Sequence, residues 1–414
     1  MPQSNPHSPT LQTFHYGWVI VGTGTLIIIA CLGFGRFALG MLLPAMGMAL
    51  SLDYAEMGFI STGNFVGYLA AVLVSGLLAS RVGERRLIVA GLLLVAGSMA
   101  AVSQAQGFWS VLIFYVVTGF GAGIANIPIM ALVAHWFGRA ARGRAAGFIV
   151  SGSGLAILFS GWAIPLINGT LGEEGWRWSW LLLGLLVSVI AVVSLILIRN
   201  RPSELGLRPI GVSLEGSDSH HRDLPHPHAG RVVAHLGAVY FTFGFTYVIY
   251  ATFIVTTLVQ ERGFSEAVAG QFWMWVGLVS IFSGPLFGTL SDRLGRKPAL
   301  MMVFTLHTVA YLFVALPLPG VFAYLSIFLW GIGVWSIPSI MAAAVGDYLG
   351  AERAAAAFGT ITLFFGVGQI SGPGLAGVLA DYTGTFAWSF VMAAGVTGLG
   401  VLVSSTLRRS QQEN

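Results

Sequence analysis

The sequence has little charge. Only 9% of its 414 residues are Asp, Glu, Lys or Arg, while 56% are hydrophobic. Soluble domains carry about 25% charged residues. A chain this apolar could not cover its surface with polar side chains, so we expect it to lie in a lipid bilayer.

Cysteine is nearly absent as well. The single residue of this type, Cys31, excludes an intrachain disulfide framework and a cysteine-rich metal site. The net charge of +4 does not indicate a nucleic-acid partner, because the basic residues are spread between apolar runs. We expect no cofactor and no bound metal.

What the sequence does contain is a series of apolar runs of about 20 residues or more. Each is long enough to cross a hydrocarbon core about 30 Å thick as a helix. The predicted fold class is an all-α integral membrane protein with twelve transmembrane helices, at residues 17–48, 55–79, 86–105, 108–135, 143–168, 176–198, 231–259, 266–290, 297–317, 320–346, 353–380 and 384–407.

The basic residues predict the orientation. With the N-terminus inside, 17 of the 20 Lys and Arg residues fall in cytoplasmic segments, and only Arg177 and Arg262 fall in outer loops. Cytoplasmic loops of membrane proteins are enriched in Lys and Arg in this way. We therefore expect both termini in the cytoplasm and the chain in the cell inner (plasma) membrane.

The longest non-apolar segment, residues 199–230, contains prolines and four histidines: His220, His221, His226 and His228. Histidine clusters can bind metal. Because prolines separate these residues in a polar stretch, we favour a flexible cytoplasmic linker. It would divide the chain into an N-terminal six-helix bundle at 1–198 and a C-terminal one at 231–414.

The two halves repeat each other. The segment Gly76–Gly83 aligns with Gly288–Gly295 at an offset of 212 residues, and the same offset pairs Gly138 with Gly350. Two six-helix halves related by an axis along the membrane normal are a known transporter plan. The repeat predicts two pseudo-symmetric bundles.

On these features the sequence resembles the major facilitator superfamily (MFS) over essentially its whole length. The loop Gly288-x-x-x-Asp292-Arg293-x-Gly295-Arg296-Lys297 is similar to the superfamily's cytoplasmic signature. The resemblance implies a conformational switch that braces the two halves, formed by Gly76, Arg81, Gly83, Gly288, Asp292, Arg293, Gly295 and Arg296.

The first copy of this loop departs from the signature, since Ser80 replaces the usual acid and Glu84 stands where the second half has Arg296. We expect a weaker brace there. Tyr115 occupies the position of the superfamily's usual helix-4 arginine, which argues against the common proton-coupled drug exporters.

Two subgroups are suggested within the superfamily. Gly35-Arg36-Phe37 with Leu42-Leu43-Pro44, Asn64-Phe-Val-Gly-Tyr68 and Gly368-Gln369-Ile-Ser-Gly-Pro373 look like YbfB/YjiJ-type transporters. Gly175-Trp-Arg-Trp178 and Arg201-Pro-Ser-Glu-Leu-Gly-Leu207 are similar to oxalate/formate and monocarboxylate carriers.

Arg36 is the central candidate for substrate binding. It lies within an apolar run, without an acid nearby in sequence, and too deep for easy snorkelling to the headgroups. A structural arginine paired across helices is the alternative. Other polar or aromatic side chains at similar depth complete the predicted binding site: Asn64, Tyr68, Asn126, Tyr247, Tyr250, Trp335 and Gln369.

One cation, several neutral donors and an aromatic wall suit a small carboxylate with an apolar body, because arginine holds a carboxylate through two parallel N–H bonds. No acid lies at mid-helix, which leaves coupling to H⁺, exchange against a counter-anion and facilitated diffusion open.

We predict a secondary active transporter of a small organic anion, working by alternating access as a monomer in the bilayer. An exporter of drugs or amphipathic metabolites is the alternative. An enzyme is not expected, since no nucleophile, metal set or acid–base pair lies at depth.

Overall fold

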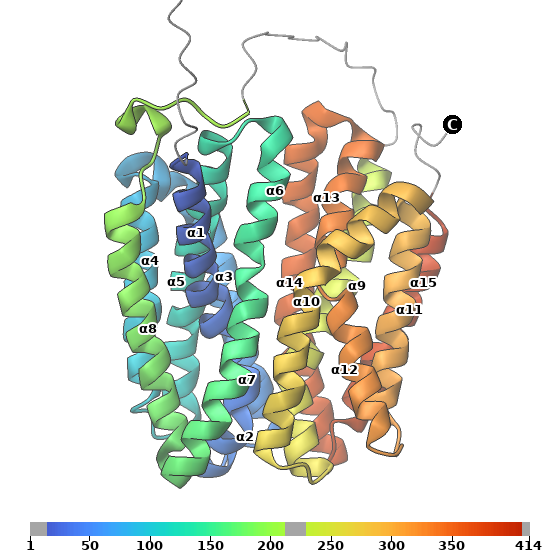
Figure 1. The fold of residues 1–414 in the computed structure, drawn as a ribbon. Coiled ribbons are helices and arrows are strands. Elements are labelled where there is room, and N and C mark those ends of the chain that lie inside the picture. The colour runs from blue at the N-terminus through green and yellow to red at the C-terminus, as the bar shows by residue number, and fades with distance from the viewer. Residues whose placement is uncertain (1–14, 212–228, 408–414) are drawn as a thin grey trace, which may run out of the picture.

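The computed structural model describes residues 15–211 and 229–407. The described chain is almost entirely helical (Figure 1). Its first half contains α1 (Gly17–Ile28), η1 (Ile29–Phe37), α2 (Ala38–Leu50), α3 (Tyr54–Val82), α4 (Glu84–Val102), α5 (Phe108–Trp136), α6 (Arg139–Val150), α7 (Gly152–Leu171), η2 (Gly172–Glu174), α8 (Gly175–Leu197) and η3 (Pro202–Leu205). The second half contains α9 (Ala229–Thr256), η4 (Thr257–Glu261), α10 (Glu266–Leu294), α11 (Arg296–Ala315), α12 (Val321–Gly333), α13 (Ser336–Leu349), α14 (Ala351–Thr383) and α15 (Ala387–Ser405).

The membrane-spanning helices agree with the prediction. Eleven continuous helical stretches of the described chain are long and apolar enough to cross a membrane. One of them, Ala141–Leu197, is 57 residues long and contains two of the predicted spans. It reverses direction at η2, where α7 ends and α8 begins (Figure 1). The all-α fold of a multi-pass membrane protein is confirmed.

The internal repeat extends to the helix boundaries. α1 and α9 begin 212 residues apart, as do α3 and α10, and α4 and α11. The capping residues correspond too: Asp53 caps α3 through the Glu56 amide, and Ser265 caps α10 through the Val268 amide. The repeat thus holds for where these helices begin and how they are capped.

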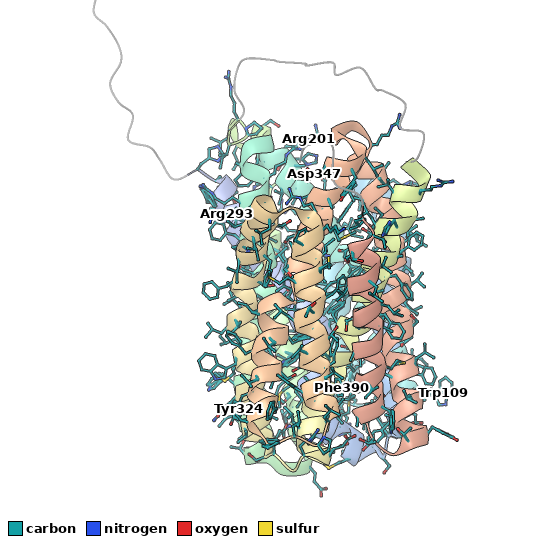
Figure 2. All side chains as sticks on the ribbon, turned by 90° about the vertical axis from the view of Figure 1, so that its right-hand side faces the viewer. Trp109, Arg201, Arg293, Tyr324, Asp347 and Phe390 are labelled. Atoms are coloured by element: carbon teal, nitrogen blue, oxygen red, sulfur yellow. The ribbon has the colours of Figure 1, made fainter. Side chains whose placement is uncertain are left out.

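Two faces of the molecule can be distinguished. We call the face that holds the start of α1 and the ends of α8 and α15 the linker face, and the opposite one the far face (Figure 1). Arg201, Arg293 and Asp347 lie toward the linker face, whereas Trp109 and Tyr324 lie toward the far face (Figure 2).

The start of the predicted linker is held against the first half. Ile210 forms a β-bridge with Phe137, and the Trp136 indole nitrogen donates to the carbonyl of Arg199 at 2.9 Å. The two ends of residues 199–211 are therefore attached to the end of α5, while residues 203–208 between them are exposed. The four histidines of the predicted linker lie outside the described residues.

The two halves meet most closely toward the far face, through glycines. A Cβ added to Gly161 of α7 would lie 2.6 Å from the carbonyl oxygen of Gly270 on α10. On α3 the main chain of Gly58 lies against Pro373 and Gly377 of α14. At Gly76 and Gly288, closer to the linker face, an added Cβ would meet nothing within 4 Å. Main chain of the two described halves thus meets closely at Gly161 and Gly58, whereas Gly76 and Gly288 have open space beside them.

Candidate functional site

Arg36 lies on η1, a nine-residue π-helical segment within the first transmembrane span. The helix is continuous over Gly17–Leu50, as the sequence predicts, but it changes to π-helical geometry in this segment. Side chains from other helices satisfy carbonyl groups of this segment: Asn64 Nδ2 donates to the Gly35 carbonyl at 3.1 Å, and the Tyr115 hydroxyl donates to the Arg36 carbonyl at 3.1 Å. π-Helical turns often occur at functional sites, and this one fixes the main chain that carries Arg36.

Aromatic rings surround the Arg36 guanidinium. Its central carbon lies 4.5 Å from the ring centroid of Phe65 and 4.4 Å from that of Tyr68, both on α3. The hydroxyl of Tyr247 on α9 also interacts with it. None of the ion pairs between described residues involves Arg36. The charge is therefore stabilised by ring faces and a hydroxyl rather than by a carboxylate.

One edge of the guanidinium is left without a partner. Arg36 Nε and Nη2 are both buried, and neither forms a hydrogen bond to any described residue. These two nitrogens carry the parallel N–H bonds on the side of the planar fork that can hold both oxygens of a carboxylate. Buried donors of this kind are costly unless a ligand or water satisfies them.

The predicted polar residues pair with the two tyrosines that contact Arg36. Asn126 of α5 donates from Nδ2 to the Tyr68 hydroxyl at 2.7 Å. Gln369 of α14 donates from Nε2 to the Tyr247 hydroxyl. These two pairs come from opposite halves of the molecule, and Arg36 contacts a tyrosine of each.

Trp335 lies between α12 and α13, where the helix that the sequence predicts at residues 320–346 is interrupted. Its main-chain amide donates to Ser283 Oγ at 3.1 Å. Its ring is 5.3 Å from the centroid of Phe37 and 6.3 Å from that of Tyr247. The indole nitrogen is buried, and no described residue accepts a hydrogen bond from it. Trp335 therefore lies beside Phe37 and Tyr247, and its indole N–H is a further donor without a partner among the described residues.

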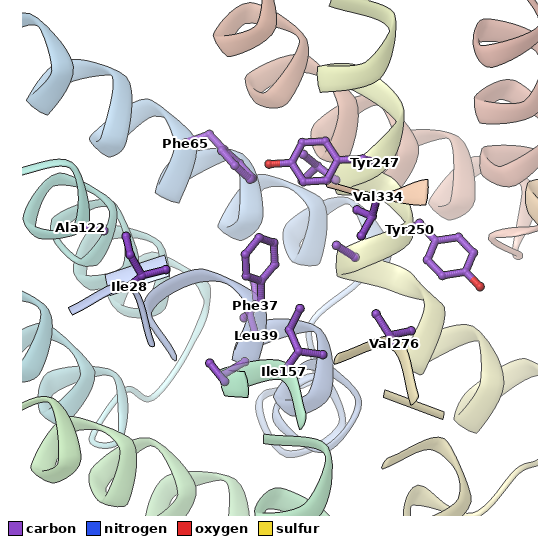
Figure 3. Close-up of a cluster of buried hydrophobic side chains, with 14 of the residues drawn as sticks. Ile28, Phe37, Leu39, Phe65, Ala122, Ile157, Tyr247, Tyr250, Val276 and Val334 are labelled. Carbon is purple, nitrogen blue, oxygen red and sulfur yellow. The ribbon is translucent and has the colours of Figure 1, made fainter. Parts of the chain in front are cut away.

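Tyr250 is the one predicted site residue that the structure places elsewhere. Its ring stacks on Trp330 at 4.6 Å, and its hydroxyl pairs with Ser326 Oγ at 2.8 Å, inside the second half. Figure 3 shows the Tyr247 hydroxyl directed toward Phe65, while the Tyr250 hydroxyl points away from it.

A small cavity adjoins Arg36 on the side of η1, α3, α5 and α9. Its lining is mostly apolar and consists of Phe37, Ser61, Asn64, Phe65, Tyr115, Val248, Ala251 and Thr252, together with Arg36 itself. Sequence reasoning missed Phe37, Phe65 and Tyr115. The spacing of Phe65 and Tyr68, three residues apart on one helix face, could have indicated that both rings reach the same partner.

The signature loops differ between the halves, as the sequence suggests. In the second copy Arg296 bonds to Asp292 Oδ1 and to Asp347 Oδ2, each at 2.6 Å. In the first copy Glu84 and His135 occupy the positions equivalent to Arg296 and Asp347, and they are 3.9 Å apart. The acid and the basic residue thus exchange places between the two copies.

The remaining predicted switch residues line the same two loops. Gly83 and Gly295 have φ angles of 84° and 91°, which favour glycine, at the ends of α3 and α10. Arg81 and Arg293 are exposed in the last turns of those helices. The Asp292, Asp347 and Ser291 partners of Arg296 all belong to its own half.

A family model described as "Uncharacterised MFS-type transporter YbfB" matches residues 28–405, more than half of the chain. The chain belongs to this family. It is therefore a transporter of the major facilitator superfamily and not an enzyme, and the resemblance seen in the sequence is confirmed. Among the described residues no three His, Cys, Asp or Glu side chains form a group able to hold a metal ion.

Relatives of this YbfB-type chain are named as transporters of organic acids. It is 24% identical to the hexuronate transporter of Bacillus subtilis, over 87% of each chain. It is 26% identical to the 3-(3-hydroxy-phenyl)propionate transporter of Escherichia coli, over 93% of each chain. A solved bacterial homologue of the human lysosomal transporter Spinster has the same fold, with a TM-score of 0.72 at 16% identity, covering 95% of this chain and 97% of that one.

Proposed function

We propose that this protein moves a small organic anion, a carboxylate, across the cytoplasmic membrane by alternating access. The observation that carries the proposal is the Nε–Nη2 edge of Arg36, which is buried, has no acidic partner among the described residues and belongs to a guanidinium that contacts tyrosines of both halves. A carboxylate bound there would satisfy both donors at once. The names of the hexuronate and phenylpropionate carriers, both of them carboxylate transporters, support this substrate class.

The proposed movement is a rocking of residues 1–198 against residues 231–414, with 199–230 as the connection. The site lies where Arg36 of one half meets Tyr247, Trp335 and Gln369 of the other, as alternating access requires. We assign the linker face to the cytoplasm, because the basic residues gather in its segments. Both termini then lie inside the cell.

The test is carboxylate binding to purified Arg36 variants. A thermal-shift screen of carboxylates, phosphates and sugars identifies a ligand for the parent. Arg36→Lys keeps the charge but loses the planar fork, and Arg36→Gln loses both. Losing a charge-assisted hydrogen bond costs about 1.5–3 kcal/mol, so Arg36→Gln should bind about 10- to 150-fold more weakly.

Arg144→Gln is the matched control. This arginine also lies over a ring, 5.0 Å from the centroid of Trp18, but it is exposed on α6 and away from the site. It should bind the ligand as the parent does. If a well-folded Arg36→Gln protein binds the same anion as tightly as the parent, the site assignment is wrong. Uncharged amphipathic ligands whose transport survives loss of Arg36 would favour the exporter.

A further inference from the structure

We propose that the Arg36 site selects carboxylates whose body is a flat aromatic ring and discriminates against polyhydroxylated acids. This inference rests on the proposed function, because it concerns what is attached to the bound carboxylate. It follows from two observations: which atoms around the free edge of Arg36 still lack hydrogen-bond partners, and which surfaces surround that edge.

The polar side chains beside Arg36 are largely committed to one another. Tyr68 is bound to Asn126, and Tyr247 is bound to Gln369. Asn64 Nδ2 donates to the carbonyls of Gly35 and Tyr115, and Ser61 pairs with Thr252 across the halves at 3.0 Å. A substrate hydroxyl that approached these paired groups would have to break one of their bonds.

Few unpaired polar atoms remain in this group. The buried atoms without a partner are the Arg36 edge, the Trp335 indole nitrogen, and the side-chain oxygens of Asn64 and Asn126. The Arg36 edge takes the carboxylate. A sugar acid brings a hydroxyl on nearly every carbon, and each one buried without a partner lowers affinity by roughly tenfold. The few free polar atoms of the site cannot satisfy all the hydroxyl groups of such an acid, so its affinity should be low.

Aromatic rings form much of the surroundings of Arg36: Phe37, Phe65 and Tyr115 line the cavity beside it. Phe65 and Tyr68 cover the guanidinium from α3, and Trp335 reaches across from the second half to within 5.3 Å of Phe37. Tyr247 stacks on Phe365 at 5.8 Å. Aromatic rings prefer offset-stacked or edge-to-face partners. In an acid whose ring is joined to the carboxylate by a short chain, the carboxylate can bind the free edge of Arg36 while the ring packs against these aromatic side chains.

Binding to the purified full-length protein tests the inference with four probes: 3-phenylpropionate, 3-cyclohexylpropionate, glucuronate and uncharged 3-phenylpropanamide. We expect 3-phenylpropionate to bind tightest, at least about tenfold more tightly than glucuronate. The saturated-ring acid should bind more weakly than the aromatic one, and the amide should not compete.

Trp335→Leu should weaken 3-phenylpropionate binding and largely remove its advantage over the cyclohexyl acid. Trp275→Leu is the control, because Trp275 is 57% exposed on α10 and outside the site. The ratio between the two acids reports selectivity, which a general structural defect would not change. If the ratio of the two affinities is unchanged in Trp335→Leu, Trp335 does not contribute to the selectivity for aromatic acids.

The outcomes separate this inference from the proposed function. If glucuronate binds as tightly as 3-phenylpropionate and Arg36→Gln abolishes both, the aromatic selectivity is wrong and the carboxylate site stands. If the amide binds and no carboxylate does, the proposed function fails, and this inference fails with it. The parent protein alone distinguishes aromatic from polyhydroxylated acids, so the test does not depend on any variant folding.

Discussion

Arg36 combines two properties that rarely coincide inside a membrane, a permanent charge and an open edge. Intramembrane charges usually pair with one another or with carbonyl groups. Here Phe65 and Tyr68 cover the guanidinium, while Nε and Nη2 remain free. The depth of Arg36 was readable from the sequence. Its free edge was not, because that depends on how α3 and α9 pack around it.

Tyr247 and Tyr250 provide a matched pair of substitutions at the residue scale. Tyr247→Phe removes the hydroxyl that contacts both Arg36 and Gln369, so we expect ligand affinity to fall by about 2- to 12-fold, the equivalent of one hydrogen bond. Tyr250→Phe removes a hydroxyl bound to Ser326 and should leave affinity unchanged. Titration calorimetry with the identified anion measures both.

The opposite ranking, with Tyr250→Phe weakening binding and Tyr247→Phe neutral, would contradict the geometry of the site. The sequence could not have ranked the two tyrosines. They lie three residues apart, so helical periodicity alone places them on the same side of α9. Only contacts with Ser326 and Trp330, distant in the chain, separate Tyr250 from the Arg36 group.

At the scale of elements, the sequence predicts where helices run but not where they are irregular. Long apolar runs gave the spans to within a few residues, since the thickness of the bilayer determines their length. The π-helical segment η1 was not predictable, because the groups that satisfy its carbonyls, Asn64 and Tyr115, lie on α3 and α5. The break before Trp335 likewise depends on Ser283 of α10.

The contact between α7 and α10 makes a prediction at this scale. Gly161→Leu would force a side chain against the Gly270 carbonyl and hold the far face apart. Overpacking of this kind costs about 1–3 kcal/mol, which would shift the equilibrium toward the far-face-open state by about 5- to 150-fold. Spin labels at Glu173 and Tyr382, exposed on opposite halves, should report longer distances in a double electron–electron resonance experiment.

Gly169→Leu serves as the control, because an added Cβ at this end of α7 meets nothing within 4 Å. Its distance distribution should match that of the parent. If Gly161→Leu also leaves the distribution unchanged, the α7–α10 contact does not govern closure of the far face.

For the whole molecule, the repeat was the strongest information in the sequence. The offset of 212 residues found from glycines also relates the starts of α1 and α9 and of α3 and α10. What the repeat could not reveal is how the halves differ. The exchange of acidic and basic positions between Arg296–Asp347 and Glu84–His135 became visible only when α5 and α13 brought His135 and Asp347 to equivalent places.

The orientation of the molecule is tested by reporter tags. Tags at residue 215 and at the C-terminus should report the cytoplasm, and a tag at residue 172, in the turn between α7 and α8, should report the outside. The reason is the concentration of arginine in the segments of the linker face. A periplasmic signal from either of the first two tags would refute the proposed orientation.

The glycine contacts between the halves also bear on the speed of transport. Where Gly161 meets Gly270 and Gly154 meets Gly277, main chain touches main chain, and the glycines themselves add no side chain to the contact. When such surfaces separate, there are few rotamers to rearrange and little interdigitated packing to undo. We therefore expect the activation enthalpy of the rocking motion to be small, so that turnover changes only gently with temperature.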